Sequence, residues 1–324
     1  MIDSVDLQLN GKLLLTGEYF VLDGVPGLAV PTRLGQRFRA TPDGIGRLTW
    51  VARDVHGEEW FRGTFGPAGS LSASDPAVAR RLWEILLAAE GLRPGVLKHV
   101  LAGYTVRTDL QFDRHWGLGS SSTLIAGVAR WLEVDPYALL EATFGGSGYD
   151  LACAVNNQPI IYRRYQRNYA RVMGSRGTHL SQVQRVKWEP GWKDQTYFIY
   201  RNEKQNSRDG IRAYREREVP EGVKTEIAEL TLALALPPPH LRAAAQLLER
   251  HEELVSRTLG LRTVKEELFP DFPGTLKSLG AWGGDFVWAL SEEPAEKITA
   301  YFNARGYPTV IPYAGMILPA PASK

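Results

Sequence analysis

A glycine- and serine-rich stretch at residues 117–123 constrains this chain more than any other feature. It reads Gly-Leu-Gly-Ser-Ser-Ser-Thr and leads directly into residues 124–132, whose apolar side chains recur at helical spacing. This pattern predicts a tight glycine turn that ends at the N-terminus of a helix. Unpaired backbone N–H groups and the positive end of the helix dipole meet there and favour a bound phosphate group. A helix simply capped by serine after a glycine turn also fits, so both interpretations stay open on this stretch alone.

The composition narrows the function classes. A chain of 324 residues is long enough for two domains. Its formal net charge of +2 argues against a dedicated nucleic-acid-binding protein, and its single cysteine rules out an internal disulfide framework. The first residues include acids and no long apolar run, and no stretch approaches a membrane span in length. We therefore expect a cytoplasmic, enzyme-sized protein with neither a nucleic-acid nor a membrane partner.

The order of the expected elements indicates an α+β protein. We expect strands at residues 7–15 (broken at Asn10-Gly11), 28–31, 104–111, 159–165, 196–200 and 309–318, and antiparallel strands across 37–65 with turns at Asp43-Gly44 and His56-Gly57. Helices are expected at residues 75–91, 137–143, 224–236, 240–259 and 296–305. The chain becomes richer in helical patterns towards its end. This change predicts a first domain of residues 1–190 and a smaller α+β domain of residues 191–324.

An aspartate stands just after a glycine cluster in the middle of the chain. The cluster spans residues 145–148, and Asp150 follows it at the start of a run of small residues with helical character. Such a place suits a positioned carboxylate, although an aspartate that caps a helix fits the same pattern. Cys153, in the same run, is predicted to be a small core residue because no activating partner is visible nearby.

Seven basic residues follow between positions 163 and 187, with no acid among them. They form either a rim that attracts an anionic substrate or a solvated basic hairpin. A polar loop at residues 201–208 adds further side chains that can donate hydrogen bonds to phosphate. Neither segment identifies a ligand by itself.

Four motifs stand along the chain in a particular order. They are Gly11-Lys12 with Gly17-Glu18-Tyr19, the stretch 117–122, Gly148-Tyr149-Asp150, and Gly280-Ala281-Trp282-Gly283-Gly284-Asp285. In this order they resemble the motifs of the GHMP kinases, the superfamily of galactokinase, homoserine kinase, mevalonate kinase and phosphomevalonate kinase. The likeness runs from about Lys12 to Met316. Residues 17–23 look like the mevalonate and phosphomevalonate kinase branch, and residues 148–152 look like a bacterial subgroup named for its Gly-Tyr-Asp-Ile-Ala motif.

The resemblance implies a two-domain GHMP kinase fold, with a ribosomal-protein-like α/β domain followed by a ferredoxin-like α+β domain. It implies ATP and Mg²⁺ as cofactors. The ATP phosphates would be bound by Gly117, Leu118, Gly119, Ser120, Ser121 and Ser122, and magnesium by Ser121 and Glu141. Asp150 would be the base that faces the acceptor hydroxyl, with Lys12 holding it ionised or stabilising charge on the transferring group. Contacts with the acceptor are implied for Glu18, Tyr19, Gly280, Ala281 and Gly283.

The function implied by this resemblance is the ATP-dependent phosphorylation of a hydroxyl group on a small acid, with mevalonate as the first candidate. The alternatives are a phosphomevalonate kinase, a sugar kinase of the same superfamily, and a non-catalytic binding protein that kept the fold. The expected partners are ATP and the small-molecule acceptor, and the expected assembly is a monomer or a homodimer.

Three departures from the family pattern bear on the site. Residues 113–116 replace the usual proline and alanine-glycine before the phosphate loop. Trp282 and Asp285 stand where glycines are customary, and Tyr19 replaces a histidine that is common in mevalonate kinases. Two roles are open for Trp282: its ring forms a lid over the active site, or it packs under its own loop.

Overall fold

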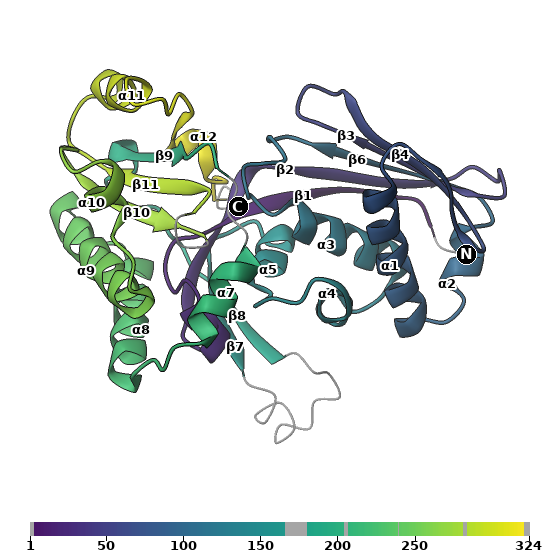
Figure 1. Cartoon of the computed structure of the whole chain (residues 1–324), viewed down its shortest axis with the longest axis horizontal. Coiled ribbons are helices and arrows are strands. Elements are labelled where there is room, and N and C mark those ends of the chain that lie inside the picture. The colour runs from purple at the N-terminus through teal and green to yellow at the C-terminus, as the bar shows by residue number, and fades with distance from the viewer. Residues whose placement is uncertain (1–2, 166–179, 204–206, 239, 281–283, 321–324) are drawn as a thin grey trace.

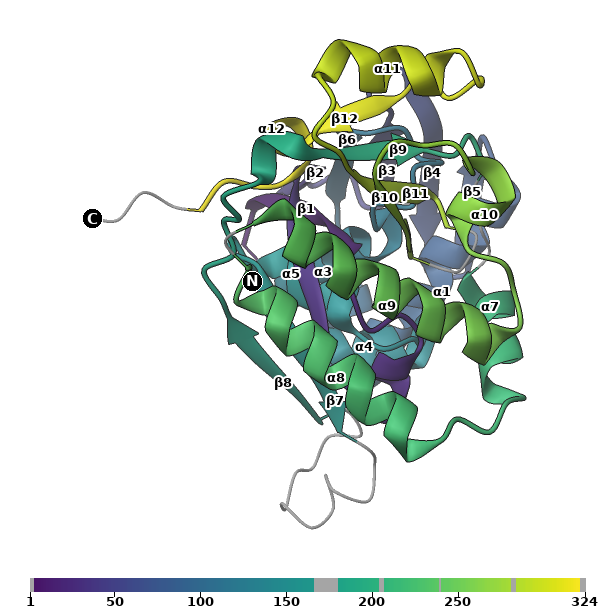
Figure 2. The same cartoon turned by 90° about the vertical axis from the view of Figure 1, so that its left-hand side faces the viewer.

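Two β-sheets and their covering helices form the computed structural model, which describes residues 3–165, 180–203, 207–238, 240–280 and 284–320 (Figure 1). The first sheet has eight strands and the second has four. Helices α1, α3, α4 and α5 lie together on one side of the first sheet (Figure 1). Helices α8 and α9 pack against each other, and α9 also packs on the second sheet (Figure 2). The expected α+β class is confirmed.

One long strand, β2 (Gly27–Pro42), organises the first sheet. It pairs with β1 (Val5–Leu14) along most of its length, with β6 (Tyr104–Leu110) near its end, and with β7 (Ile160–Tyr165) near its start. The remaining strands extend the sheet outwards: β3 (Leu48–Arg53), β4 (Glu59–Gly66), β5 (Gly69–Ala73) and β8 (Leu180–Arg185). The pairing of β1 with β2 shifts its register between Asn10 and Gly11, which is the break that the sequence led us to expect there.

The expected turn at Asp43-Gly44 lies between two strands that run antiparallel, β2 and β3, but β6 separates them. The turn at His56-Gly57 joins the directly paired antiparallel strands β3 and β4. Strand β6 lies between β2 and β3, antiparallel to β2 and parallel to β3. The carbonyl of Gly103, just before β6, accepts a hydrogen bond from the Asp43 N–H group at 3.0 Å. Alternation along the chain identifies strands, but a strand from a distant segment can still insert between two neighbours.

Two helices begin as their Asp-Pro pairs predict. The Asp75 carboxylate accepts the N–H groups of Ala77 and Val78 at the start of α1 (Pro76–Leu92), and Asp135 accepts that of Ala138 in α4 (Pro136–Thr143). The other helices on the first sheet are α2 (Val96–Val100), α3 (Ser120–Leu132) and α5 (Tyr149–Val155). The later helices are α7 (Ser207–Arg215), α8 (Glu221–Ala235), α9 (Leu241–Leu259), α10 (Val264–Leu268) and α11 (Ala295–Asn303). Short 3₁₀ helices are η1 (Phe20–Asp23) and η2 (Lys193–Gln195).

The second sheet has the order β10 (Thr275–Leu279), β11 (Phe286–Leu290), β9 (Thr196–Tyr200) and β12 (Val310–Pro312). The expected strand at 309–318 is only partly correct, because the chain turns after β12 into α12 (Tyr313–Met316). This turn buries Met316 and Ile317, and the Leu318 N–H group then donates to the Pro31 carbonyl of β2 at 3.1 Å. Burial of two apolar side chains against the first sheet therefore overrides extension of the strand.

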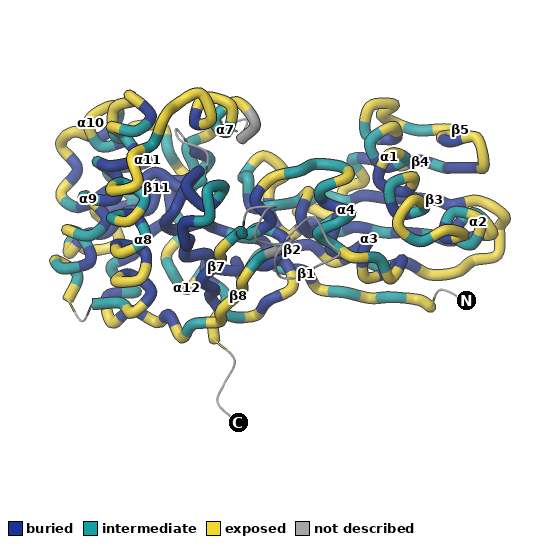
Figure 3. Tube along the Cα trace, turned by 90° about the horizontal axis from the view of Figure 1, so that it is seen from below, coloured by how far each residue is buried: buried dark blue, intermediate teal, exposed yellow. Residues whose placement is uncertain are grey.

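One apolar core reaches from the first sheet to the second. It includes Leu13 and Val30 of the first sheet, Trp288 of the second, and Trp188 between them. The rings of Trp188 and Trp288 lie 6.1 Å apart in an edge-to-face arrangement. Figure 3 shows that buried segments concentrate in the interior strands, while outer loops are exposed. The division of the chain at residue 190 stays a prediction.

Gly11 stands where β1 meets the glycine-serine loop. A Cβ atom at this position would lie 2.8 Å from the Leu34 carbonyl oxygen and 2.9 Å from that of Leu118, and closer still to Thr32 Oγ1. Both carbonyls belong to the backbone, so neither can rotate away. We expect Gly11→Ala to destabilise the protein by about 1–3 kcal/mol through overpacking. Thermal unfolding measures this, with Gly91→Ala, where a Cβ meets nothing within 4 Å, as the control.

Candidate active site

The glycine-serine loop lies between β6 and α3, and α3 begins at Ser120 as predicted. Gly117 and Gly119 have φ angles of 65° and 93°, in the left-handed region that glycine tolerates without strain. The hydroxyl of Ser122 donates to the Gly119 carbonyl at 2.8 Å, which closes the first turn of the helix. The free N–H groups at this helix start therefore line a cavity formed by backbone that only glycine can adopt easily.

A cavity of about 280 Å³ brings most of the predicted site residues together. Its lining includes Lys12, Gly117, Gly119, Ser120, Ser121, Ser122, Asp150 and Gly280. These residues come from β1, the loop, α3, α5 and the segment after β10. Leu118 is fully buried beneath the loop, and its carbonyl accepts the Lys12 N–H group at 2.9 Å. Four segments that are distant in sequence thus converge on one small polar space.

Lys12 and Asp150 influence each other electrostatically within this cavity. Burial lowers the pKa of Lys12, but Tyr149, Asp285 and Asp150 outweigh that effect and raise it above its ordinary value. Burial raises the pKa of Asp150, and the Lys12 ammonium opposes that shift without cancelling it. The Asp150 carboxylate also accepts the Leu151 N–H group at 3.0 Å. The result is a permanently charged lysine beside a carboxylate that is more basic than usual.

Asp285 is the site residue to which sequence reasoning assigned no role. It lines the same cavity, and its carboxylate lies directly against Gly117, so that any Cβ atom there would collide with it. Its backbone carbonyl accepts the Arg201 N–H group at 3.0 Å. Asp285 therefore places a second carboxylate at the glycine-serine loop, next to Asp150 in the same cavity.

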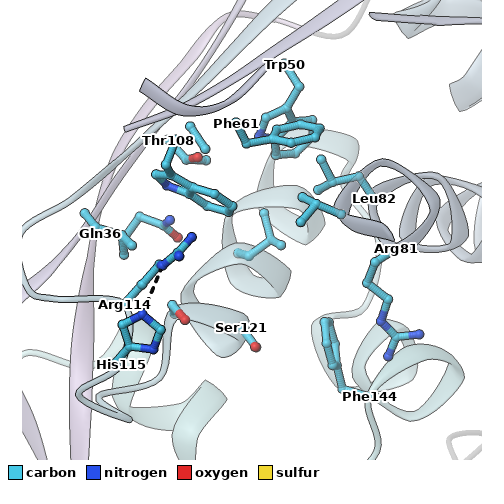
Figure 4. Close-up of a pocket in the computed structure, with 16 residues that line it drawn as sticks. Gln36, Trp50, Phe61, Arg81, Leu82, Thr108, Arg114, His115, Ser121 and Phe144 are labelled. Atoms are coloured by element: carbon cyan, nitrogen blue, oxygen red, sulfur yellow. Dashed lines mark hydrogen bonds between the residues drawn. The ribbon is translucent and has the colours of Figure 1, made fainter. Parts of the chain in front are cut away.

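A second cavity of about 400 Å³ adjoins the first and shares Ser120, Ser121, Arg114 and Phe144 with it (Figure 4). Its other walls are mainly apolar and aromatic: Trp50, Trp60, Phe61, Leu82, Leu110 and Leu124. The Arg114 guanidinium lies 5.5 Å from the centre of the Trp60 ring, and the Trp60 Nε1 atom is buried without a hydrogen-bond acceptor among the described residues.

Sequence reasoning missed this second cavity. The available signal was the aromatic content of residues 50–61, but alternating strand patterns predict such residues as ordinary core. An aromatic pocket next to the glycine-serine loop has the shape and polarity to hold a flat heterocycle by stacking.

Glu141 does not line the cavity that holds Ser121. It lines a neighbouring cavity of about 550 Å³, with Arg164, Arg212 and Arg215 on the opposite walls. Its assignment as a magnesium ligand therefore stays a prediction. Among the described residues there is no group of three or more His, Cys, Asp and Glu side chains arranged to hold a metal ion. The oxygen donors that line the cavity include the Ser121 hydroxyl and the carboxylates of Asp150 and Asp285, which are ligand types that Mg²⁺ accepts alongside phosphate oxygens.

Glu18 and Tyr19 line a small cavity of about 80 Å³ together with Gly280 and Tyr149. Glu18 is only 2% exposed, and its carboxylate forms an ion pair with Lys277. Ala281, Trp282 and Gly283 lie outside the described residues, as do Arg167, Arg171 and Arg176 of the basic segment. The two roles considered for Trp282 therefore both stay predictions. Across the described part of the chain, no helix is long and apolar enough to span a membrane.

No protein-family model matches the sequence, and no curated protein matches it. Solved structures match over nearly the whole chain. A Lin0012 protein from Listeria innocua is 15% identical, with a TM-score of 0.70 and coverage of 96% of this chain and 97% of that one. The mevalonate kinase of Methanococcus jannaschii is 13% identical, with a TM-score of 0.67 and coverage of 98% and 99%.

The phosphomevalonate kinase of Streptococcus pneumoniae, in complex with phosphomevalonate and AMPPNP, is 18% identical, with a TM-score of 0.63 and coverage of 97% and 98%. Identities this low establish a shared fold and leave the substrate undetermined. The fold that the four motifs led us to expect is confirmed: this chain has the fold of the GHMP kinases.

Proposed function

We propose that this chain is an ATP-dependent kinase that phosphorylates a hydroxyl group of a small acid, with mevalonate as the first candidate. One observation carries the proposal. Lys12, Asp150 and the glycine-serine loop line a single cavity, and that cavity adjoins an aromatic pocket. The fold shared with mevalonate kinases of Methanococcus jannaschii and L. major, the latter solved with R-mevalonate, supports this choice of acceptor.

The loop and the aromatic pocket would bind the nucleotide. The N–H groups at the start of α3 and the serine hydroxyls would hold the phosphates, and the pocket around Trp60 would take the base. Trp60 lines this pocket and offers the face of its ring for stacking on that base. Ser121 would hold Mg²⁺ together with phosphate oxygens, and the bound ion would neutralise charge on those oxygens.

Asp150 and Lys12 would act on the acceptor and on the transferring phosphoryl group. Asp150 would accept the proton of the attacking hydroxyl, and its raised pKa makes it a better base than an exposed aspartate. Lys12 would stabilise negative charge on the transferring phosphoryl group, since its raised pKa keeps it charged at any physiological pH. Positioning and charge stabilisation are the main demands of phosphoryl transfer, and these two residues meet both.

A substrate screen that detects the release of ADP tests the identity of the acceptor. A galactokinase from Lactococcus lactis has the same fold at a TM-score of 0.61, so a sugar acceptor is the principal alternative. Mevalonate, phosphomevalonate and galactose are compared at equal concentrations in the presence of MgATP. Turnover of mevalonate supports the proposal, and turnover of galactose alone assigns a sugar kinase. Tight ATP binding without turnover of any acceptor would instead indicate a binding protein.

The base assignment predicts the behaviour of Asp150→Asn. This change keeps the shape and removes the charge, so kcat should fall by about 10²–10⁴-fold while the ATP dissociation constant stays near that of the wild type. In the wild type, kcat/KM should decrease as the pH falls through the Asp150 pKa, which lies above the ordinary aspartate value. Asp135→Asn is the matched control, because asparagine caps α4 as well as aspartate does. Near-normal turnover by Asp150→Asn would refute the base assignment.

The magnesium assignment predicts the behaviour of Ser121→Ala. Loss of the hydroxyl should raise the Mg²⁺ concentration needed for half-maximal turnover by about 10- to 100-fold. A magnesium titration at saturating ATP measures this, with Ser70→Ala on exposed β5 as the control. An unchanged titration curve would exclude Ser121 as a ligand.

If the aromatic pocket binds the nucleobase of ATP, Trp60→Ala should have a specific effect. Stacking of an aromatic ring on a base contributes about 1–3 kcal/mol, so KM for ATP should rise by about 5- to 100-fold while KM for the acceptor stays unchanged. Trp83→Ala is the control, because Trp83 stacks on Phe65 at 6.0 Å and does not line the cavity. An equal rise for ATP and acceptor would point to general loss of structure and against a base pocket.

A further inference from the structure

Tyr19 has a backbone conformation that is costly for a bulky residue. Its φ and ψ angles are 56° and −43°, and a positive φ at an aromatic residue is an outlier. The ring is stacked on Tyr214 of α7 at 5.6 Å, with an angle of 18° between the planes. Its hydroxyl oxygen lies so close to Gly210 of α7 that any Cβ atom at 210 would overlap it. Strain of this kind persists only where the surroundings impose it.

A buried cluster of four titratable side chains stands beside this strained residue: Glu18, His251, Glu252 and Lys277. Lys277 and His251 are fully buried, and both glutamates are at most 3% exposed. Lys277 pairs closely with Glu18, and its ammonium lies 4.0 Å from Glu252. The cluster thus joins the turn before η1, helix α9 and strand β10 at one point.

His251 and Glu252 fix the neighbouring backbone. His251 Nε2 accepts the Gly17 N–H group at 3.0 Å and lies 3.5 Å from the Glu18 carboxylate. Burial holds the pKa of His251 well below its usual value, so the ring stays neutral and can accept this bond. Glu252 accepts the Ser278 hydroxyl at 2.9 Å. Burial, opposed by Lys277, raises the pKa of Glu252 to about 7. Glu18 is therefore the closer partner of the single ammonium group.

The chain segments that carry Glu18 and Lys277 both continue into the wall of the same cavity. Tyr19 follows Glu18 directly, and Gly280 follows Lys277 by three residues; both line the 80 Å³ cavity. Ser147 and Tyr149, which precede Asp150, form its opposite wall. This cavity shares Ser147, Tyr149 and Gly280 with the cavity that holds Asp150. An acceptor whose hydroxyl faced Asp150 would therefore lie beside it.

The buried cluster positions the surrounding backbone more than it stabilises the fold. Buried ion pairs can often be replaced by apolar side chains of similar volume without loss of stability, whereas removal of one partner leaves a costly unpaired charge. Strain at Tyr19 opposes folding as well. The strained Tyr19 and the buried Glu18 charge are adjacent in one turn, and both residues line the same cavity. Two costly features at one place indicate a functional constraint.

We infer that the Glu18–Lys277 pair is a positioning element: it fixes Tyr19 and Gly280 relative to each other in the wall of the 80 Å³ cavity and thereby sets the affinity for the acceptor. Glu18 acts through Lys277 and the backbone, and the residue that it positions is Tyr19, for which the family resemblance implies a contact with the acceptor. This inference rests on the proposed kinase function. Wild-type turnover of mevalonate is therefore measured first, and its absence would count against the proposed acceptor before any variant is compared.

The first test uses Glu18→Gln, Lys277→Met and the double variant. The single variants should lose thermal stability, and the double variant should recover most of it. Without the Lys277 ammonium, burial favours the protonated Glu252 carboxyl, so no unpaired charge remains. The double variant should nevertheless show at least about a tenfold rise in KM for mevalonate with KM for ATP unchanged, since one tenfold step corresponds to the loss of a single good contact. A stable double variant with wild-type KM for mevalonate would overturn the inference.

The second test leaves the charged cluster intact and decides the matter if the double variant fails to fold. Gly210→Ala displaces the Tyr19 ring while favouring the helix, so KM for mevalonate should rise about tenfold without loss of stability. Addition of Tyr19→Phe removes the overlapping hydroxyl and should restore much of the affinity. Gly222→Ala on α8 is the matched control, because a Cβ there meets nothing within 4 Å. Unchanged KM in Gly210→Ala, or no rescue by Tyr19→Phe, would contradict the role of Tyr19.

Discussion

One backbone hydrogen bond joins the first sheet to the candidate site: the Lys12 N–H group of β1 donates to the Leu118 carbonyl of the glycine-serine loop at 2.9 Å. Gly11 makes this approach possible, because any side chain there would strike the same carbonyl. The bond places the Lys12 side chain beside the loop and aligns α3 with β1. The charge arrangement around Asp150 therefore depends on a contact that involves no side chain.

Different interactions form the two ends of the candidate site. At the glycine-serine loop, glycines and free N–H groups form the surface, so this part of the site is formed by backbone geometry with positive φ angles at Gly117 and Gly119. At the end proposed for the acceptor, buried charges and a strained tyrosine hold the turn after β1 against β10. A backbone-built cradle suits a phosphate group, which every nucleotide shares, whereas side-chain packing suits recognition of one particular acceptor.

Local signals predicted local structure well. The glycine turn before α3, the Asp-Pro starts of α1 and α4, and the break in β1 are each determined by a few adjacent residues, so the sequence was sufficient for them. The strands on either side of Asp43-Gly44 are not paired with each other, because β2 pairs there with residues 62 to 74 positions away. Sequence alternation carries no information about pairing partners. The aromatic pocket was missed for the same reason: Trp60 and Arg114 meet only after β4 and the loop are brought together.

The sequence by itself determined the motifs of the site and the class of the fold, because backbone preferences of glycine, proline and capping residues act over a few positions. Only the tertiary structure decided which charges face each other. Glu18 and Lys277 are 259 positions apart in the chain, and burial converts two ordinary polar residues into one fully desolvated pair. Burial likewise makes Asp150 more basic despite its lysine neighbour. Desolvation depends on every residue that excludes water from a group, so no local pattern in the sequence can specify it.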